Sequence, residues 1–132
     1  MFRPDPRLPE TLQVTDEVYA DNSLDRGHIA RRYDLVWGPA EEAGRANFDS
    51  FYFTNITPQR NSFNQSGLHG VWGLLENALM AEVLLDARRV SVFGGPVLGE
   101  DDPVYRGVQV PLEFWKTLVY RVDGALRADR SC

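Results

Sequence analysis

One helical stretch followed by several strand-like segments is the feature that most constrains the fold of this chain. Between about Asn64 and Ala87, apolar side chains recur three or four positions apart, a spacing that places them on one face of a helix. These side chains are Leu68, Trp72, Leu75, Leu79 and Val83. Segments rich in β-branched and aromatic residues follow, as is typical of strands. They are Val90–Phe93, which Gly94-Gly95-Pro96 ends, then Val104–Val110 and Phe114–Val122. A helix beside such strands predicts an α+β fold.

Turn and loop signals divide the rest of the chain. Asp123-Gly124 predicts a tight hairpin, whose second arm consists of only Ala125–Ala128. Phe51–Ile56 is aromatic and β-branched, so it predicts a strand, and Pro58 is expected to end it. Residues 38–50 predict a polar connection with at most one short helical turn.

The length of 132 residues predicts a single domain, residues 1–132, around one core. Residues 1–24 are rich in proline and acidic groups and predict an extended lead-in, which Asp21–Ser23 ends in a turn. Three apolar residues of this lead-in are expected to point inward, namely Leu12, Val14 and Val18. Residues 127–132 are predicted to form a disordered tail. The second arm of the final hairpin would then be too short to pair with the whole of the first.

Charge and cysteine content exclude some classes of protein. A net charge of −5 argues against a protein that coats nucleic acid with a broad basic surface, although a local phosphate site remains compatible with it. The only cysteine, Cys132, is the last residue, so the fold cannot depend on an internal disulfide. No window resembles a signal peptide or a membrane span, which makes the cytoplasm the default location and predicts no membrane partner.

A first cluster with chemical potential is Asp25-Arg26-Gly27-His28. A histidine near its unperturbed pKa of about 6.5 can take a proton from water at neutral pH. Arg26 would lie close to the same phosphate and neutralise charge that develops in the transition state. We expect Gly27 to let the backbone approach a ligand without a side chain in the way. The four residues alone are equally typical of a turn with a surface histidine.

A second cluster consists of Thr54–Gln59 and Phe63-Asn64-Gln65 at the start of the predicted helix. The amide oxygen of Asn64 is a hard, neutral ligand. Since Mg²⁺ gives up water reluctantly, one such ligand with waters and phosphate oxygens forms a workable coordination set. By residue type alone, Asn64 could instead cap the helix. Glu76, on the same helix, could hold a metal-bound water or be an ordinary exposed glutamate.

The order of these segments resembles a known family. Asp-Arg-Gly-His, Thr-Asn-Ile-Thr-Pro-Gln, Asn-Gln and Trp-x-x-Leu-Glu occur at residues 25–28, 54–59, 64–65 and 72–76. This series resembles the DNA/RNA non-specific endonuclease family, the ββα-metal (His-Me finger) group that includes Serratia nuclease and endonuclease G. The resemblance continues through Phe93–Pro96 and Val110–Lys116 and covers about residues 2–126. It implies an α+β, ββα-metal nuclease fold, truncated at both ends relative to the family.

The resemblance also assigns roles to single residues. His28 matches the general base that activates water, and Arg26 matches the arginine that stabilises the phosphate. Asn64 matches the only direct protein ligand of Mg²⁺, with Mn²⁺ as the alternative ion, and Glu76 matches an acidic residue that contacts metal-bound water. Asn55 matches an asparagine that we take as an organiser of the site. The implied reaction is sequence-nonspecific hydrolysis of DNA and RNA that leaves a 5′-phosphate; relatives are often secreted.

Two other functions stay open. By this alignment, the family's further active-site arginine would fall before Met1, and neither Arg3 nor Arg7 clearly replaces it. The chain would then be a truncated, catalytically impaired remnant that binds nucleic acid or a protein partner. A third hypothesis is a magnesium phosphoesterase of small nucleotides. Because a sheet without its edge strands exposes unpaired backbone groups, a homodimer or a partner chain is expected to cover them.

Overall fold

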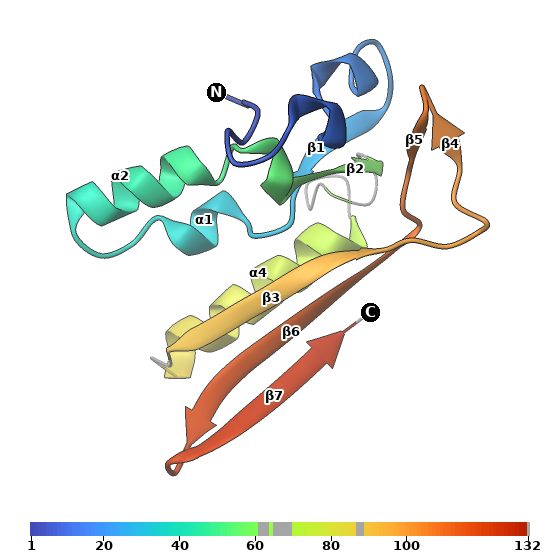
Figure 1. Cartoon of the computed structure of the whole chain (residues 1–132). Coiled ribbons are helices and arrows are strands. Elements are labelled where there is room, and N and C mark those ends of the chain that lie inside the picture. Colours follow the sequence, from blue (N-terminus) through green and yellow to red (C-terminus); the bar gives the residue numbers. More distant parts are fainter. Residues whose placement is uncertain (61–63, 65–69, 87–88, 132) are drawn as a thin grey trace.

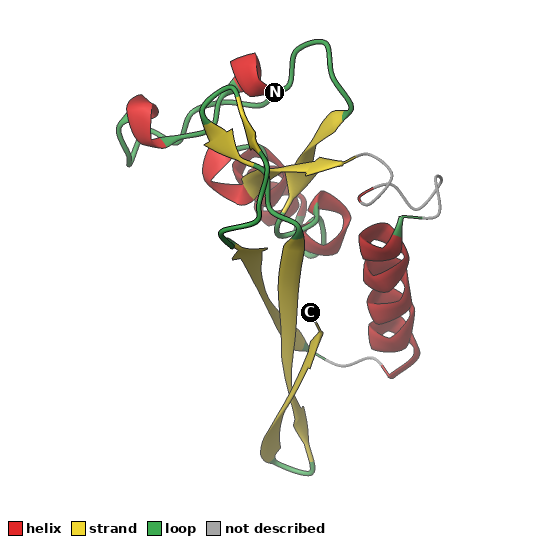
Figure 2. Ribbon diagram, turned by 90° about the vertical axis from the view of Figure 1, so that its right-hand side faces the viewer, coloured by secondary structure: helices red, strands yellow, loops and turns green. Residues whose placement is uncertain are grey.

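The computed structural model describes residues 1–60, 64, 70–86 and 89–131, and it contains two main sheets (Figure 1). Strands β1 (Leu24–His28) and β2 (Ile56–Arg60) form an antiparallel ribbon. The larger, antiparallel sheet has the strand order β3-β6-β7. Its strands are β3 (Val90–Val97), β6 (Glu113–Val122) and β7 (Ala125–Ser131). Helix α4 (Val71–Asp86) lies along one face of this sheet (Figures 1 and 2), so the chain has the predicted mix of helix and strand.

The N-terminal segment packs against the β1–β2 ribbon. It contains two short 3-10 helices, η1 (Glu10–Leu12) and η2 (Asp16–Val18). Four buried side chains form a core between this segment and the ribbon, and they are Val18, Tyr19, Phe53 and Ile56. Residues 1–24 are therefore not simply an extended lead-in. The predicted inward contacts of Val14 and Val18 are confirmed, whereas Leu12 is exposed. The turn at 21–23 is confirmed, with a positive φ of 52° at Asp21.

Helices occupy most of the connection between β1 and β2. They are α1 (Arg32–Leu35), α2 (Ala40–Asp49) and the 3-10 helix η3 (Phe53–Asn55). The prediction of a mostly polar loop at 38–50 was therefore wrong. Pro39 immediately precedes α2, and Glu41 and Glu42 lie in its first turn, where carboxylates stabilise the positive end of the helix dipole.

The predicted strand Phe51–Ile56 was also misplaced, because β2 begins only at Ile56 and runs through Pro58 to Arg60. Proline lacks the backbone N–H, which excludes it from central strands but not from edge strands. In a two-stranded ribbon both strands are edges. β3 likewise continues through Gly94-Gly95-Pro96 to Val97, and it is an edge of the larger sheet.

Turn chemistry explains the other differences. Residues 104–110 form a small hairpin, β4 (Val104–Tyr105) and β5 (Val108–Gln109), rather than one strand, because Arg106 and Gly107 adopt positive φ angles of 49° and 78°. The hairpin at Asp123-Gly124 is confirmed, with φ angles of 50° and 79°.

The second arm of that hairpin is longer than predicted. β7 pairs with β6 up to Ser131, so residues 127–131 are not a disordered tail; Cys132 lies outside the described residues. Backbone pairing does not need apolar side chains, and a cross-strand bond of 2.6 Å from the Tyr120 hydroxyl to Asp129 Oδ2 adds to it. The predicted helix is confirmed between Val71 and Asp86, while most of its predicted first turns lie outside the described residues. In the part of the chain that the structure describes, no helix has the length and apolarity to cross a bilayer.

Candidate active site

The motif Asp25–His28 makes up most of β1, and strand alternation divides it between the two faces of the ribbon. Successive side chains of a strand point to opposite faces, and cross-strand partners share a face. We call one face the aromatic face, and it carries Arg26, His28 and Ile56. The other, the polar face, carries Asp25, Gly27, Thr57 and Gln59.

His28 lies on the aromatic face against two rings. Its imidazole meets Phe51 edge-on, with ring centroids 5.2 Å apart, and its centroid lies 6.0 Å from that of Phe2. The Nε2 atom is buried and has no hydrogen-bond partner among the described residues. Burial lowers the pKa of His28, and the charge of Arg32 lowers it further. The imidazole is therefore neutral at neutral pH and is not a surface turn histidine.

Arg26 is held on the same face, two positions before His28. Its guanidinium carbon lies 5.1 Å from the ring centre of Tyr19 and 5.2 Å from that of Phe2. Its Nε donates a hydrogen bond of 2.7 Å to Asp16 Oδ1. Stacking on two rings restricts a guanidinium to a defined orientation. The aromatic face thus combines the neutral imidazole of His28 with the positively charged guanidinium of Arg26, which is held in a defined orientation.

Asn64 contacts the polar face through Asp25. Its Nδ2 donates a hydrogen bond of 3.0 Å to Asp25 Oδ2. An ionised carboxylate only accepts hydrogen bonds, so the amide nitrogen must face Asp25 and the amide oxygen must point away from it. This side chain does not cap α4, which begins at Val71.

One amide oxygen beside one carboxylate suits a particular kind of cation. Mg²⁺ accepts oxygen ligands and keeps several waters, so it needs few protein atoms. Within the described residues, no three His, Cys, Asp or Glu side chains gather as a metal-binding group, which is what a structural zinc site would need. The oxygen of Asn64, which the hydrogen bond to Asp25 turns outward, fits as one ligand of a hydrated divalent cation.

Gly27 makes room for a side chain rather than for a ligand. A Cβ atom at this position would lie 2.3 Å from Cδ and 2.4 Å from Oε1 of Gln59. Gln59 is only 1% exposed, and its amide has no hydrogen-bond partner among the described residues. The prediction that Gly27 admits a ligand is therefore wrong, since Gln59 fills that space.

Asn55 clamps the backbone just after His28. Its side-chain oxygen accepts a hydrogen bond of 2.9 Å from the Ala30 N–H, and its Nδ2 donates one of 2.9 Å to the Ala30 carbonyl. Its backbone carbonyl accepts a bond of 2.8 Å from the Ile29 N–H. A further bond from Nδ2 to the Ser50 carbonyl, 3.0 Å long, joins this clamp to the end of α2.

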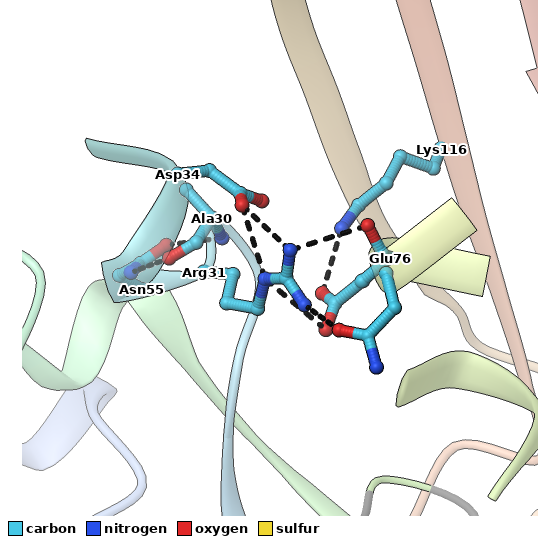
Figure 3. Close-up of polar contacts among 7 residues, drawn as sticks. Ala30, Arg31, Asp34, Asn55, Glu76 and Lys116 are labelled. Atoms are coloured by element: carbon cyan, nitrogen blue, oxygen red, sulfur yellow. Dashed lines mark hydrogen bonds and ion pairs between the residues drawn. The ribbon is translucent and has the colours of Figure 1, made fainter. Parts of the chain in front are cut away.

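Glu76 is buried in a group of charges between α4, β6 and the segment after β1 (Figure 3). Its Oε1 accepts a hydrogen bond of 2.7 Å from Lys116 Nζ, and its Oε2 lies 4.0 Å from Arg31 Nε. Arg31 also donates to Asp34 Oδ1 and, over 2.7 Å, to Asn77 Oδ1. Burial raises the pKa of Glu76, and the charges of Lys116 and Arg31 oppose that rise. Glu76 is therefore not an ordinary exposed glutamate.

The structure brings the predicted residues together in pairs. Arg26 and His28 share the aromatic face, and Asn64 joins Asp25 on the polar face. No hydrogen bond or ion pair within the described residues links His28, Asn64 and Glu76 to one another. Arg3 and Arg7 make contacts outside this site. The guanidinium carbon of Arg3 lies 3.5 Å from the ring centre of Phe48, and Arg7 forms an ion pair with Asp5.

Three residues of this region were missed in the sequence, namely Arg31, Gln59 and Lys116. Lys116 carried a usable signal, because it is the only lysine and it shares the inward alternation of Phe114 along β6. An inward lysine requires a buried partner. Gln59 belongs to the quoted Thr54–Gln59 segment, but its contact with Gly27 depends on strand register. Arg31 has no feature that separates it from the other arginines.

Comparisons with known proteins identify the family. The family described as "DNA/RNA non-specific endonuclease" matches residues 1–128. An uncharacterised protein of Sinorhizobium fredii, y4fB, is 43% identical over 120 residues, which cover 86% of this chain and 18% of that protein. The mitochondrial nuclease EXOG of Danio rerio is 35% identical over 134 residues, 92% of this chain and 36% of that protein. The chain thus spans well under half the length of these curated relatives.

A solved structure shares the fold. The EndoG chain of an EndoG/EndoGI complex superposes with a TM-score of 0.71 at 24% sequence identity, over 98% of this chain and 55% of that one. At this identity the likeness establishes the ββα-metal fold, and the match of the family over residues 1–128 establishes membership. This chain belongs to the DNA/RNA non-specific endonuclease family.

Proposed function

We propose that this chain carries a divalent-metal-dependent endonuclease site that hydrolyses phosphodiester bonds of DNA and RNA without sequence preference. The observation that carries the proposal is the buried imidazole of His28, whose Nε2 has no partner among the described residues and whose pKa is lowered. A neutral imidazole with an unused nitrogen suits a general base. Family membership indicates the class of reaction.

His28 would take the proton of the attacking water as its oxygen forms a bond to phosphorus. Negative charge then builds on the phosphate oxygens, and Arg26, on the same face, would stabilise it. The bond from phosphorus to the 3′ oxygen breaks, and a proton must reach that oxygen. The products are a 3′ hydroxyl and a 5′ phosphate.

Asn64 would hold the cation through its amide oxygen, with Asp25 fixing the orientation of the amide. When bound, Mg²⁺ or Mn²⁺ would neutralise phosphate charge and supply an acidified water for the departing oxygen. Glu76 Oε1 is engaged by Lys116, which leaves Oε2 as the atom that would accept a hydrogen bond from the hydrated ion. Asn55 would organise the site by holding the backbone that follows His28.

The two faces of the ribbon constrain where the substrate binds. His28 is the last residue of β1. A phosphate bound across this end of the ribbon would meet groups from both faces, which is the arrangement that the proposal requires. None of the proposed residues reads a base edge, so sequence preference should be low.

A plasmid-nicking assay tests the proposal directly. The purified chain should relax supercoiled plasmid in Mg²⁺ and should not do so in EDTA. His28→Ala should lower the rate by about 10²–10⁴-fold, the range typical of a lost general base. End-labelling of the products by a kinase should require prior phosphatase treatment, because the new 5′ ends carry phosphate.

Trp37→Ala is the matched control, since Trp37 is an exposed aromatic residue that follows α1 and should leave nicking unchanged. Circular dichroism establishes that each variant is folded. Nicking that persists in EDTA, or that His28→Ala leaves intact, contradicts the mechanism. A folded wild-type chain that binds DNA without nicking it would favour the catalytically impaired remnant, and turnover of a dinucleotide but not of plasmid would favour the small-nucleotide phosphoesterase.

A further inference from the structure

The ion pair of Glu76 and Lys116 is the most deeply buried charge pair of the described residues. The two side chains are 6% and 3% exposed, and Lys116 Nζ lies 2.7 Å from Glu76 Oε1. Nζ also lies 4.8 Å from the ring centre of Trp72, one turn before Glu76 on α4. Both charges are thus removed from water at the contact between α4 and β6.

Stability alone does not explain this pair. Moving two charges out of water costs several kcal/mol per ion, and their attraction often does no more than offset that cost. An apolar pair of similar volume would pack α4 onto β6 at least as well. Trp72 and Phe114 already make such a contact, with ring centroids 5.5 Å apart. A reason connected with the site is therefore needed.

The surroundings of Glu76 leave its two oxygens in different situations. Lys116, from β6, holds Oε1. Arg31, from the segment after β1, lies 4.0 Å from Oε2, which is beyond hydrogen-bond distance, and Asp34 of α1 accepts from the same guanidinium (Figure 3). Among the described residues, these three are the charged groups that act on the Glu76 carboxyl.

We propose that Lys116 is a positioning residue for the nuclease reaction: it binds Oε1 of the buried Glu76 carboxyl, so that Oε2 would be left to accept a hydrogen bond from a hydrated cation when one is bound. This inference rests on the proposed function. Lys116 touches neither substrate nor metal. It acts through Glu76, and its position on β6 connects the larger sheet to the site.

Loss of the lysine should change the charge of Glu76. Burial raises the pKa of this carboxyl, and Lys116 is the strongest opposing influence. Lys116→Met keeps the length and apolar stem of the side chain and removes only the charge. The pKa of Glu76 should then lie higher than in the wild-type chain, and a protonated carboxyl is a poorer acceptor for metal-bound water.

A ¹³C NMR titration of the glutamate carboxyl groups, with Glu76→Gln to assign the signal, reads this effect without nuclease activity. In the wild-type chain Glu76 should be ionised at pH 7. In Lys116→Met its titration should move upward by about one pH unit or more. A Glu76 carboxyl that titrates near or above pH 7 in the wild-type chain overturns the proposal, even if Lys116→Met does not fold.

The pH profile of Mg²⁺-dependent nicking is the second measurement. At pH 7, Lys116→Met should lower kcat by roughly 10–100-fold, as is typical of residues that orient metal-bound groups, with little change in KM for plasmid. Raising the pH should restore much of the loss, and Lys116→Arg should rescue it. Arg121→Met, which removes an exposed charge from the same strand, should change neither readout.

The outcomes separate this inference from the proposed function. A wild-type chain that does not nick plasmid contradicts the proposed function, while the NMR titration still shows whether Lys116 sets the charge of Glu76. An active wild-type chain whose pH profile is the same in Lys116→Met contradicts the positioning role and leaves the proposed function standing. A purely structural role predicts a lower melting temperature without a shifted profile.

Discussion

On one face of the β1–β2 ribbon, His28 and Arg26 lie among aromatic rings; the other face carries the polar side chains of Asp25, Thr57 and Gln59. The two faces favour opposite chemistry. Apolar surroundings disfavour a charged imidazole and so keep His28 ready to accept a proton. Oxygen-rich surroundings suit a divalent cation that keeps its water. Four consecutive residues thus provide both environments, because a strand alternates its side chains.

The aromatic face depends on the N-terminal segment. Phe2 contacts the His28 ring, and Tyr19 supports the Arg26 guanidinium. The environment of the proposed base is therefore built by residues from the first part of the chain. The polar face depends instead on β2 and Asn64. Changes on the aromatic face should alter His28 and the neighbouring Arg26 guanidinium. Changes on the polar face should alter metal binding or packing.

After the loss of His28 itself, the largest effect is expected from Arg26→Met on the aromatic face. Removal of one group that stabilises developing charge typically lowers kcat by about 10²–10³-fold. Loss of the exposed bond to Asp16 should cost at most about 1 kcal/mol of stability. Initial-rate nicking kinetics and a urea titration measure the two effects separately. Arg45→Met, which removes an exposed arginine of α2, is the control; a folded Arg26→Met variant with normal kcat would place Arg26 outside the reaction.

Gly27→Ala should produce the next largest effect, through packing on the polar face. The new Cβ would lie 2.3 Å from Cδ of a side chain that is itself 1% exposed, so Gln59 must move. Overpacking of this kind costs about 1–3 kcal/mol, and we expect the upper end. Urea denaturation measures it.

Gly44→Ala is the matched control for this substitution. Gly44 lies in α2, where an added Cβ atom would meet no neighbouring atom within 4 Å, and alanine there should stabilise the helix by up to about 1 kcal/mol. The double variant Gly27→Ala/Gln59→Ala should recover part of the loss. If it does not, Gln59 is not the residue for which the glycine is required.

Asp25→Asn should weaken metal binding, and its effect should be smaller than those of Arg26→Met and Gly27→Ala. An asparagine at position 25 can donate as well as accept, so the Asn64 amide is no longer forced to turn its oxygen away. Loss of an orienting partner typically costs about 10–100-fold in metal affinity. Isothermal titration with Mg²⁺ or Mn²⁺ and the metal dependence of nicking measure it. Unchanged affinity for both ions would mean that Asp25 does not orient the ligand.

Local signals were sufficient for part of the fold. The three- and four-residue spacing predicted the described part of α4, and Asp123-Gly124 predicted the last hairpin. Two of the errors share one cause: Pro58 and Pro96 were read as ends of strands, although proline is tolerated on an edge strand. Whether a strand is an edge depends on its neighbours in the sheet, which the local sequence does not reveal.

The candidate site shows the same limit. The motifs identified His28, Arg26, Asn64 and Glu76 as a set, and strand alternation alone could have separated Arg26 and His28 from Asp25. The hydrogen bond between Glu76 and Lys116 joins residues 40 positions apart, and only the tertiary structure shows it. A sequence pattern therefore names the residues of such a site more readily than it pairs them.

The smallest expected effect is the contribution of His28, on the aromatic face, to the pH dependence of stability; the raised pKa of Glu76 contributes a slope of the opposite sign. The pKa of His28 is lowered from its usual 6.5 in the folded chain. Between these two pKa values the unfolded chain binds more protons than the folded chain, so stability should fall as the pH drops below about 6.5 and level off below the folded-state pKa. Urea titrations between pH 5 and 8 should show this slope in the wild-type chain, and His28→Gln should flatten it, whereas Asp25→Asn should leave it in place. A slope that survives His28→Gln would mean that burial among Phe2 and Phe51 does not set the protonation state of the proposed base, and the contrast between the two faces would lose its chemical meaning.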